Sequence, residues 1–415
     1  MPSKNIYPKL QRTGVVLEQS SLRKHNLGII FCAVRDHGAI SKAQLAQITK
    51  LTKSGVTNLV DELLKANVIM EGQIQPKNLR GRPGVLLSIN SAAASIISIE
   101  INAFHTAVIA TDLLGNEIYR ERTSTEYNLT PEARINEIAP TLERAINAAS
   151  GHTSRIYGLM IIVPGSINAD FKITSYALNW EKLEILKFVK KIIPKNIAVA
   201  INSIARLSGI AEHQFLTLND NTPEQLLHLE LGATAGIALI QHGNILLGAN
   251  SLMGAIAHMS INPQGKLCRC GRIGCSETEI SLKPLIEATC PELLSQWGKD
   301  SGYYLSEIFR RAELGEQKVI SGIDTIAESI AVTLAALITL LDPDKVILGG
   351  YPVYLEKWLL PRLLNHLSHR ILNASDLGIC TSPLDFDAAL IGGIIIFQNE
   401  IFSDPFSIFI EQSSE

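Results

Sequence analysis

The most informative segment of this chain reads Cys268-Arg-Cys-Gly-Arg-Ile-Gly-Cys-Ser-Glu277. It holds three thiols within eight positions, and His258 lies ten residues upstream. Zinc prefers a tetrahedron of thiolate sulfur and imidazole nitrogen. The glycines in the segment permit the tight turns that bring the sulfurs together. The spacing therefore predicts a closed structural zinc site that braces a loop, with four ligands: His258, Cys268, Cys270 and Cys275.

The other cysteines do not extend this pattern, because Cys32, Cys290 and Cys380 stand singly, as small core residues do. A disulfide plus a spare thiol is the alternative, but nothing else indicates an oxidising compartment. The first twenty residues are polar and mildly basic, unlike a secretory signal. The most apolar helical run, Ala331–Leu341, is too short to span a bilayer. We expect a cytoplasmic protein with no membrane partner.

Charge is unevenly distributed along the 415 residues, a length that suggests two or three domains. Residues 1–84 hold 13 Lys/Arg and 5 Asp/Glu, a net charge of +8. The remainder holds 24 basic and 35 acidic residues, a net charge of −11. A basic head on an acidic body suggests that the head meets a polyanion.

The basic head carries a helical pattern. Apolar residues between Arg23 and His37 fall at i, i+3, i+4 and i+7, which predicts one helix that Gly38 ends. Ser41 is placed to cap a second helix that runs to about Thr49. A third helix opens near Thr52 or Ser54, with one apolar face that runs to Leu64.

Two short helices joined by a tight turn, the second polar on its outer face, describe a helix-turn-helix. Short polar side chains near the start of that helix permit approach to base edges in the major groove, and Lys53 would reach a phosphate. The residues predicted to contact DNA from this helix are Lys53, Ser54, Thr57 and Asn58. A small helical bundle used for protein contact is the alternative.

Two strand-like pieces, Val68–Met70 and Val85–Ile89, follow the helices. The link between them contains Arg80 and Arg82, which suit phosphate or minor-groove contact. This pattern predicts a wing that completes a winged helix-turn-helix over residues 1–90. A solvated linker is the alternative for the two arginines.

The acidic body shows strand hairpins, then helix, strand and helix, twice over. The first cycle begins with strands Ser95–Ile101 and Thr106–Thr111, and the second with a strand at Leu226–Leu231. This repetition predicts an α/β body of two duplicated lobes around a cleft.

Together these pieces resemble the ROK family of repressors, open reading frames and sugar kinases, and most of all its repressor branch. The resemblance covers about residues 14–398. The matching pieces are Ile40–Ala46, Gly81–Pro83, Val163–Gly165, Asn179-Trp180, Leu252–His258, the cysteine segment to Glu277, and Asp342-Pro343 leading into Gly349-Gly350. The resemblance implies an actin-like body over residues 91–415, with lobe one at about 91–215 plus 386–415 and lobe two at about 216–385.

The chain departs from the kinases of this family at the general base. Family kinases carry an Asp at the start of a helix, and the corresponding position here is Ser203 or Ile204, depending on how the segment is counted. No Asp or Glu occurs between Glu184 and Glu212, so no carboxylate in this segment can take the proton of a sugar hydroxyl.

Further departures concern phosphate and sugar. The phosphate turn of the family is replaced by Glu100-Ile-Asn-Ala-Phe-His105, which lacks the glycines that let backbone N–H groups hold an anion. The second phosphate loop, Gly232–Gly236, is only partly kept, and Ala255 replaces a glutamate that binds sugar hydroxyls. Asn179, Glu277 and His258 remain as effector-binding candidates.

We therefore expect a DNA-binding transcriptional regulator, a repressor of carbohydrate-related genes, that is not an enzyme. It would bind a double-stranded DNA operator as a homodimer or homotetramer, and its body would sense a sugar or sugar phosphate. The alternatives are a sugar kinase with an appended DNA-binding head, and a regulator whose body binds a protein partner.

Overall fold

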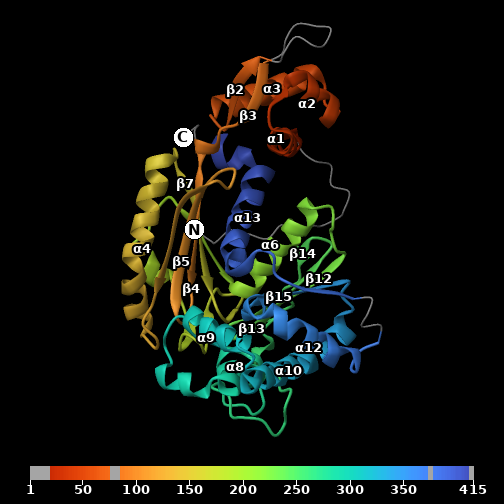
Figure 1. The fold of residues 1–415 in the computed structure, drawn as a ribbon. Coiled ribbons are helices and arrows are strands. Elements are labelled where there is room, and N and C mark those ends of the chain that lie inside the picture. Colours follow the sequence, from red (N-terminus) through yellow and green to blue (C-terminus); the bar gives the residue numbers. More distant parts are fainter. Residues whose placement is uncertain (1–18, 75–84, 373–376, 411–415) are drawn as a thin grey trace. The chain divides into compact units, whose positions relative to one another are not determined.

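The computed structural model describes residues 19–74, 85–372 and 377–410. These residues form two compact units (Figure 1). The first unit ends at Ser91 and also takes in the chain from Asn399 onward, and the second unit is Ala92–Gln398. The sequence predicts a boundary at residue 90 and groups residues 386–415 with lobe one, whereas contacts group the chain from Asn399 onward with the first unit.

Three helices and a small sheet build the first unit. Its elements are α1 (Gln19–His37), β1 (Ile40–Ser41), α2 (Lys42–Thr49), α3 (Lys53–Lys65), β2 (Ile69–Ile74) and β3 (Val85–Ile89). The sheet order is β1-β3-β2, and both pairings are antiparallel. Residues 75–84, between β2 and β3, lie outside the described residues. The predicted DNA-contacting residues Arg80 and Arg82 are among them.

Local sequence explains where these helices begin and end. Gly38 follows α1 with a φ of 65°, which glycine adopts without strain. Ser41 and Gln44 form a reciprocal capping box at the start of α2. Thr52 caps α3 by accepting a hydrogen bond from the backbone N–H of Gly55. The predicted apolar faces of α1 and α3 are buried, including Leu27, Phe31, Val56, Val60 and Leu63.

The C-terminal residues of the first unit pack on α1. The rings of Phe31 and Phe402 lie 4.6 Å apart, and the cations of Arg23 and Lys24 lie 5.3 and 5.0 Å from the ring centroid of Phe406. Phe402 belongs to the last turn of α13 (Ala388–Ser403), and Phe406 begins the π-helical turn η5 (Phe406–Ile410). The packing assigns this segment to the first unit because Phe402 becomes buried there.

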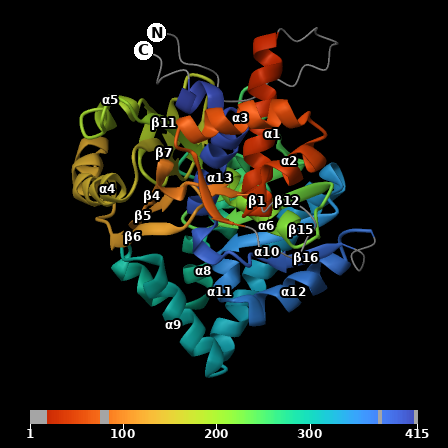
Figure 2. The same ribbon diagram turned by 90° about the horizontal axis from the view of Figure 1, so that it is seen from above.

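The second unit has two lobes, each defined by a five-stranded sheet (Figure 2). Lobe one contains β4 (Ser95–Ile101), β5 (His105–Asp112), β6 (Glu117–Ser124), β7 (Ile156–Val163) and β11 (Ala198–Ser203). Lobe two contains β12 (Gln225–Leu231), β13 (Ala235–Gln241), β14 (Asn244–Ile245), β15 (Lys345–Gly350) and β16 (Gly378–Thr381).

Both sheets have the same topology, which agrees with the predicted duplication. The orders are β11-β7-β4-β5-β6 and β14-β13-β12-β15-β16. In each sheet the first three strands form an antiparallel meander, and the fourth strand pairs in parallel with the first. The small sheet β10-β9-β8 (Trp180–Leu183, Ile173–Ser175, Ser166–Ile167) is separate.

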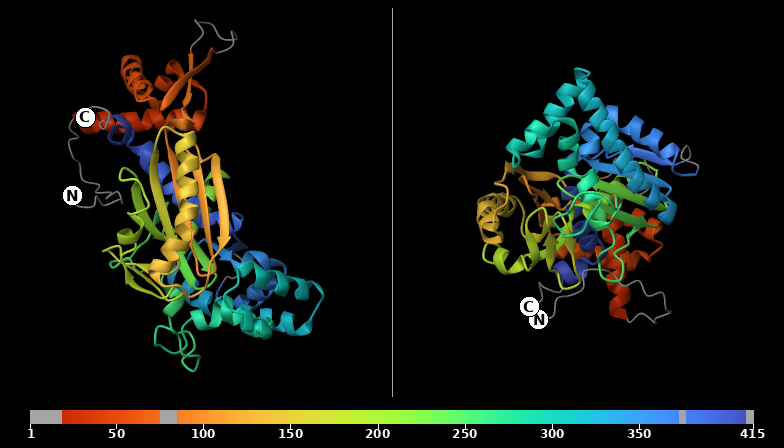
Figure 3. Two further views of the ribbon diagram at one scale, coloured as in Figure 1. Left: turned by 90° about the vertical axis from the view of Figure 1, so that its left-hand side faces the viewer. Right: turned by 90° about the horizontal axis from the view of Figure 1, so that it is seen from below.

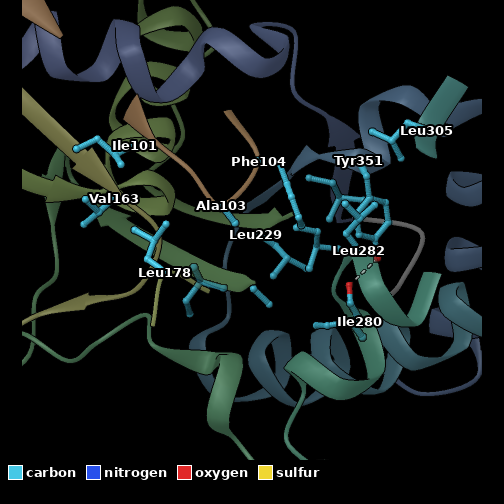
Figure 4. Packing of buried hydrophobic residues seen from close by; sticks show 14 of the residues in the cluster. Ile101, Ala103, Phe104, Val163, Leu178, Leu229, Ile280, Leu282, Leu305 and Tyr351 are labelled. Atoms are coloured by element: carbon cyan, nitrogen blue, oxygen red, sulfur yellow. Dashed lines mark hydrogen bonds between the residues drawn. The ribbon is translucent and has the colours of Figure 1, made fainter. Parts of the chain in front are cut away.

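The second unit also contains helices, some on the sheets and some packed on one another. They are α4 (Pro131–His152), α5 (Leu186–Val189), α6 (Ile204–Leu218), α7 (Glu277–Ile280), α8 (Leu282–Thr289), α9 (Ser301–Glu313), α10 (Gln317–Leu341), α11 (Tyr351–Tyr354) and α12 (Glu356–Ser368), with short 3₁₀ turns at Ser91–Ala93, Ile256–His258, Pro291–Gln296 and Asp385–Asp387. α4 lies across strands β4, β5 and β6 (Figure 3, left). One continuous apolar core joins the lobes, and Figure 4 shows Phe104 and Tyr351 within it; the Tyr351 hydroxyl donates a hydrogen bond to the Ile280 carbonyl.

Two helices, Gln317–Leu341 and Asp385–Ser403, are long and apolar enough to cross a bilayer by length and composition. The first is longer than the apolar run expected from sequence. Half of each apolar window is buried inside the protein, as in core helices of water-soluble proteins, so these helices do not indicate a membrane protein.

The contact between α1 and the C-terminal segment gives a prediction. A Cβ at Gly28 would lie 2.5 Å from the carbonyl oxygen of Ser403. We expect Gly28→Ala to lower the free energy of unfolding of the first unit by roughly 1–3 kcal/mol. The matched control is Gly151→Ala in α4, where no atom lies within 4 Å of the new Cβ. This control should gain about 0.5–1 kcal/mol. Urea unfolding with hydrogen exchange over α1 measures both, and equal stabilisation by both changes would contradict the close contact.

Candidate functional site

Four side chains from the segment predicted to bind metal converge. The ligand atoms of His258, Cys268, Cys270 and Cys275 all lie within 4.8 Å of one another. Nδ1 of His258 is 3.6 Å from the sulfur of Cys268, and the sulfurs of Cys270 and Cys275 are 3.5 Å apart. Ligand atoms about 2.0–2.3 Å from a tetrahedral ion have separations of this size. The cluster therefore fits a metal ion.

The loop that carries this cluster is fixed by close backbone contacts. Gly274 has a φ of 69°, and a Cβ there would lie 1.5 Å from the carbonyl oxygen of Asn262, so only glycine fits. Short antiparallel bridges join Ser260 to Cys275 and Leu267 to Ile273. Burial, together with hydrogen bonds to the neighbouring thiols, raises the pKa of Cys275 to about 12. A bound dication is the partner that would hold such a thiol as a thiolate.

The outer face of α3 is the second predicted site. Lys53, Ser54, Thr57 and Asn58 are all exposed, while the opposite face of the helix packs into the unit. The Thr57 hydroxyl donates a hydrogen bond to the carbonyl of Lys53, which fixes the side chain on the first turns. The structure thus brings these four side chains together on one surface.

A cleft of about 1340 Å³, its open mouth included, lies between the lobes. Residues that differ from the kinase pattern line it, namely Ser203, Ile204 and Ala255. His258 and Glu277 also line it, so the structure places two of the three predicted effector residues there. Asn179 is exposed and does not line the cleft; its side-chain amide donates to the side chain of Asn128. Its φ of 55° lies in the left-handed region, which asparagine tolerates in turns.

The first phosphate loop is closed by its own hydrogen bonds. The backbone N–H of Asn102 donates to the carbonyl of His105, and that of Ala103 donates to the side chain of Asn102. The side chain of Glu100 lies beneath this loop and is 6% exposed. These N–H groups are therefore not available to hold an anion.

The second loop is also occupied. The backbone N–H of Gly232 donates to the carbonyl of Thr234, and the Thr234 hydroxyl donates to Glu277 over 2.7 Å. The Gly232 N–H is thus bonded within the loop, and the Thr234 hydroxyl is bonded to the first residue of α7.

The start of α6 lacks an acid where family kinases have one. Ser203 is the last residue of β11 and precedes α6, whose first residue is Ile204. Sequence reasoning missed Arg206 one turn later, which is buried, lines the cleft and donates from Nη2 to the carbonyls of Ser251 and Met253. The sequence feature that could have identified Arg206 is a single charged residue among the apolar and small residues of the first turns of α6.

Sequence reasoning also missed a pair of equivalent carboxylates. Glu100 is the penultimate residue of β4, the first strand of lobe one, and Glu230 is the penultimate residue of β12, the first strand of lobe two. Both line the cleft, and each lies beside a histidine. Nε2 of His105 is 3.2 Å from Glu100, and Nε2 of His228 is 3.0 Å from Glu230. An acidic residue near the end of an otherwise buried strand was the available signal.

Comparison with known proteins places these features in a family. The sequence profile of the ROK family matches residues 96–400. The xylose repressor of Caldicellulosiruptor bescii is 25% identical over 395 residues, covering 92% of this chain and 98% of the relative. The DNA-binding transcriptional dual regulator NagC of Escherichia coli is 25% identical over 385 residues, covering 89% of this chain and 91% of the relative.

Solved structures share the fold. A ROK family transcriptional regulator described as a homologue of the E. coli MLC protein superposes with a TM-score of 0.73 at 19% identity, covering 92% of this chain and 97% of its own. A ROK glucokinase from Streptomyces griseus, in complex with glucose and AMPPNP, gives 0.60 at 19% identity and covers 73% of this chain and 98% of its own. The profile match extends over most of the second unit, and the chain therefore belongs to the ROK family.

Proposed function

We propose that this protein is a DNA-binding transcriptional regulator that represses carbohydrate-related genes. The observation that carries the proposal is the exposed polar face of α3, since a helix with a buried apolar side and short outward polar residues suits the major groove. The xylose repressor and NagC, whose names describe such regulators, align with the first unit as well as the second. The kinase structure covers a smaller share of the chain.

The first unit is best explained as a winged helix-turn-helix. α2 and α3 would form the motif, with α3 in the major groove, and β2 and β3 would support a wing that includes Arg80 and Arg82. Two-fold symmetry in a homodimer or homotetramer would place two such helices on half-sites about one helical turn apart. A protein that binds an operator in this way acts in the cytoplasm.

The second unit is proposed to be inactive as a kinase. The segment at the start of α6 has no carboxylate to act as general base, and N–H or hydroxyl groups of both phosphate loops are already hydrogen-bonded within the protein. An active sugar kinase with an appended head is the alternative function. A body that binds a protein partner is a third alternative. It is favoured only by the replacement of the sugar-binding Glu by Ala255 and of the general-base Asp by Ser203 or Ile204.

Zinc is the proposed metal of the four-residue cluster. Three thiolates and one imidazole match its preferred ligands, and four protein ligands leave no open position. Zinc bound there would stabilise the loop and so support His258 and Glu277 at the cleft.

DNA recognition can be tested on α3. Asn58→Ala should relax preference at one base pair and cost about 1–3 kcal/mol there. Lys53→Ala should weaken binding to all sequences and reduce the salt dependence of binding by roughly one unit, because one phosphate contact is lost. Lys318→Ala in α10 is the control, since it removes an exposed lysine from the second unit. Wild-type operator affinity in both head variants, measured by fluorescence anisotropy, would refute this assignment.

Metal content tests the zinc proposal. Purified protein should contain about one equivalent of zinc by elemental analysis. Cys270→Ser should lose it and unfold the loop, whereas Cys380→Ser, outside the cluster, should retain it. Protein without zinc, or a Cys270→Ser variant with unchanged zinc, would overturn the assignment.

Catalytic inactivity gives a further prediction. No phosphate transfer from ATP to glucose or N-acetylglucosamine should be detectable in a coupled assay. Binding of these sugars should be about two to four orders of magnitude weaker than to an intact family pocket, because two charge-assisted hydrogen bonds are missing. Ala255→Glu combined with Ser203→Asp or Ile204→Asp should raise sugar affinity. Turnover by the natural protein would favour the kinase alternative.

A further inference from the structure

The charged groups that line the cleft are mostly acidic. Four carboxylates do so: Glu100, Glu230, Glu277 and Asp385. Arg206 is the one Lys or Arg among the described residues of the lining, and its Nη2 donates to two backbone carbonyls. The cleft therefore carries an excess of negative charge between low-dielectric walls, which concentrates the field of those charges.

Glu100 is the most deeply placed of these acids, with only 4% of the residue exposed. Its Oε1 lies 2.7 Å from the side-chain amide of Asn102, which donates to it, and 3.2 Å from Nε2 of His105. Within the described part of the chain, no hydrogen bond or ion pair reaches Oε2. Burial alone would raise the pKa of Glu100, but the hydrogen bonds from His105 and Asn102 hold it below its ordinary value, so the group is ionised.

The remainder of the lining mixes apolar side chains with small hydroxyl-bearing ones such as Ser203, Ser208 and Ser251. Its apolar members include Phe104, Ile204, Leu231, Ile237, Met253, Ala255, Leu282, Leu305, Tyr351 and Phe386. Oε2 of Glu100 is not among the buried atoms that lack a partner, so it is open to the cleft, where water or the donor of a ligand can satisfy it. A ligand that suits this cleft has an apolar or weakly polar body and one positive group.

We propose that the cleft binds an organic ammonium ion, with its N–H⁺ group against Oε2 of Glu100 and its body against the apolar lining. The role of this ligand as the effector rests on the proposed regulatory function, but its binding does not. Glu230, at the equivalent position of lobe two, and Asp385 add to the potential that attracts a cation. Anionic ligands are disfavoured by the same potential, and the backbone N–H groups of Asn102, Ala103 and Gly232 are already bonded.

Matched sets of small molecules test this. Each set has an amine, a neutral and an acid member on one scaffold: phenethylamine, 2-phenylethanol and phenylacetate; cyclohexylmethylamine, cyclohexanemethanol and cyclohexanecarboxylate; glucosamine, glucose and glucuronate. Isothermal titration of the full-length protein at pH 6.5 should show, in at least one set, the amine binding about tenfold or more tightly than the neutral member. The acid member of that set should bind most weakly.

Variants locate the preference. Glu100→Gln should reduce the preference for the amine by about tenfold, because the buried negative charge is removed. Glu143→Gln in α4 is the matched control, since it removes an exposed carboxylate of the same unit outside the cleft lining and should change the preference by less than about twofold. Asp385→Asn provides a second test if Glu100→Gln does not fold, because asparagine tolerates the positive φ of 54° at this position.

The outcomes separate the two proposals. No preference for the amine in any set, or equal effects of Glu100→Gln and Glu143→Gln, would overturn the ammonium site. Operator binding is measured independently on the same protein. If the protein does not bind an operator, ammonium binding can still be measured in the cleft. If it does not bind ammonium ions, the DNA-binding proposal still stands.

Discussion

The close approach of α13 to α6 is the contact on which the geometry of the cleft depends. A Cβ at Gly392 would lie 2.0 Å from the carbonyl oxygen of Leu207 in α6, and one at Gly393 would lie 2.2 Å from the hydroxyl of Ser98 in β4. α6 also packs on β12 and β13 of lobe two. The two glycines therefore let α13 contact β4 of lobe one and also α6, the helix that packs on the sheet of lobe two. These contacts fix the distance between the two walls of the cleft.

Duplication of the sheet explains why an acid from each lobe lines this cleft. The first strand of each lobe is central in its sheet, paired with an antiparallel neighbour on one side and a parallel neighbour on the other. The penultimate residue of each such strand, Glu100 or Glu230, therefore occupies the same place in its lobe. The lobes differ in the source of the neighbouring histidine, because His105 begins the adjacent strand whereas His228 precedes Glu230 on the same strand. The acid is thus retained in both lobes while the loops around it have diverged.

Sequence alone predicted the parts that depend on local pattern. The apolar stripe of α3, the cap at Ser41 and the cysteine spacing each need only neighbours in the chain, and the structure agrees with the two helical features and with the convergence of the four ligand residues. The strand Ser95–Ile101 was likewise expected, and the strand expected at Leu226–Leu231 lies within β12.

What the sequence did not predict depends on contacts between distant segments. Phe402 packs on Phe31 across most of the chain length, and no periodicity links the two. Asn179 was assigned to the cleft from resemblance, although its positive φ turns the side chain to Asn128 instead. The cleft-lining role of Arg206 follows only once α6 is placed against the loop at Ser251, because burial of a charge is a property of the assembled fold.

Charge separation along the chain bears on both proposed activities. The net charge of +8 in residues 1–84 favours DNA, whereas the −11 of the remainder repels it, so the affinity for phosphates must come from the head alone. The net negative charge of the remainder also attracts any cation weakly from a distance. Salt at physiological concentration screens this attraction at separations greater than about 8–10 Å. A carboxylate that is 4% exposed is shielded from salt ions by the protein around it. A preference for amines that survives at raised ionic strength therefore reports the buried charge of Glu100 rather than the overall charge of the body.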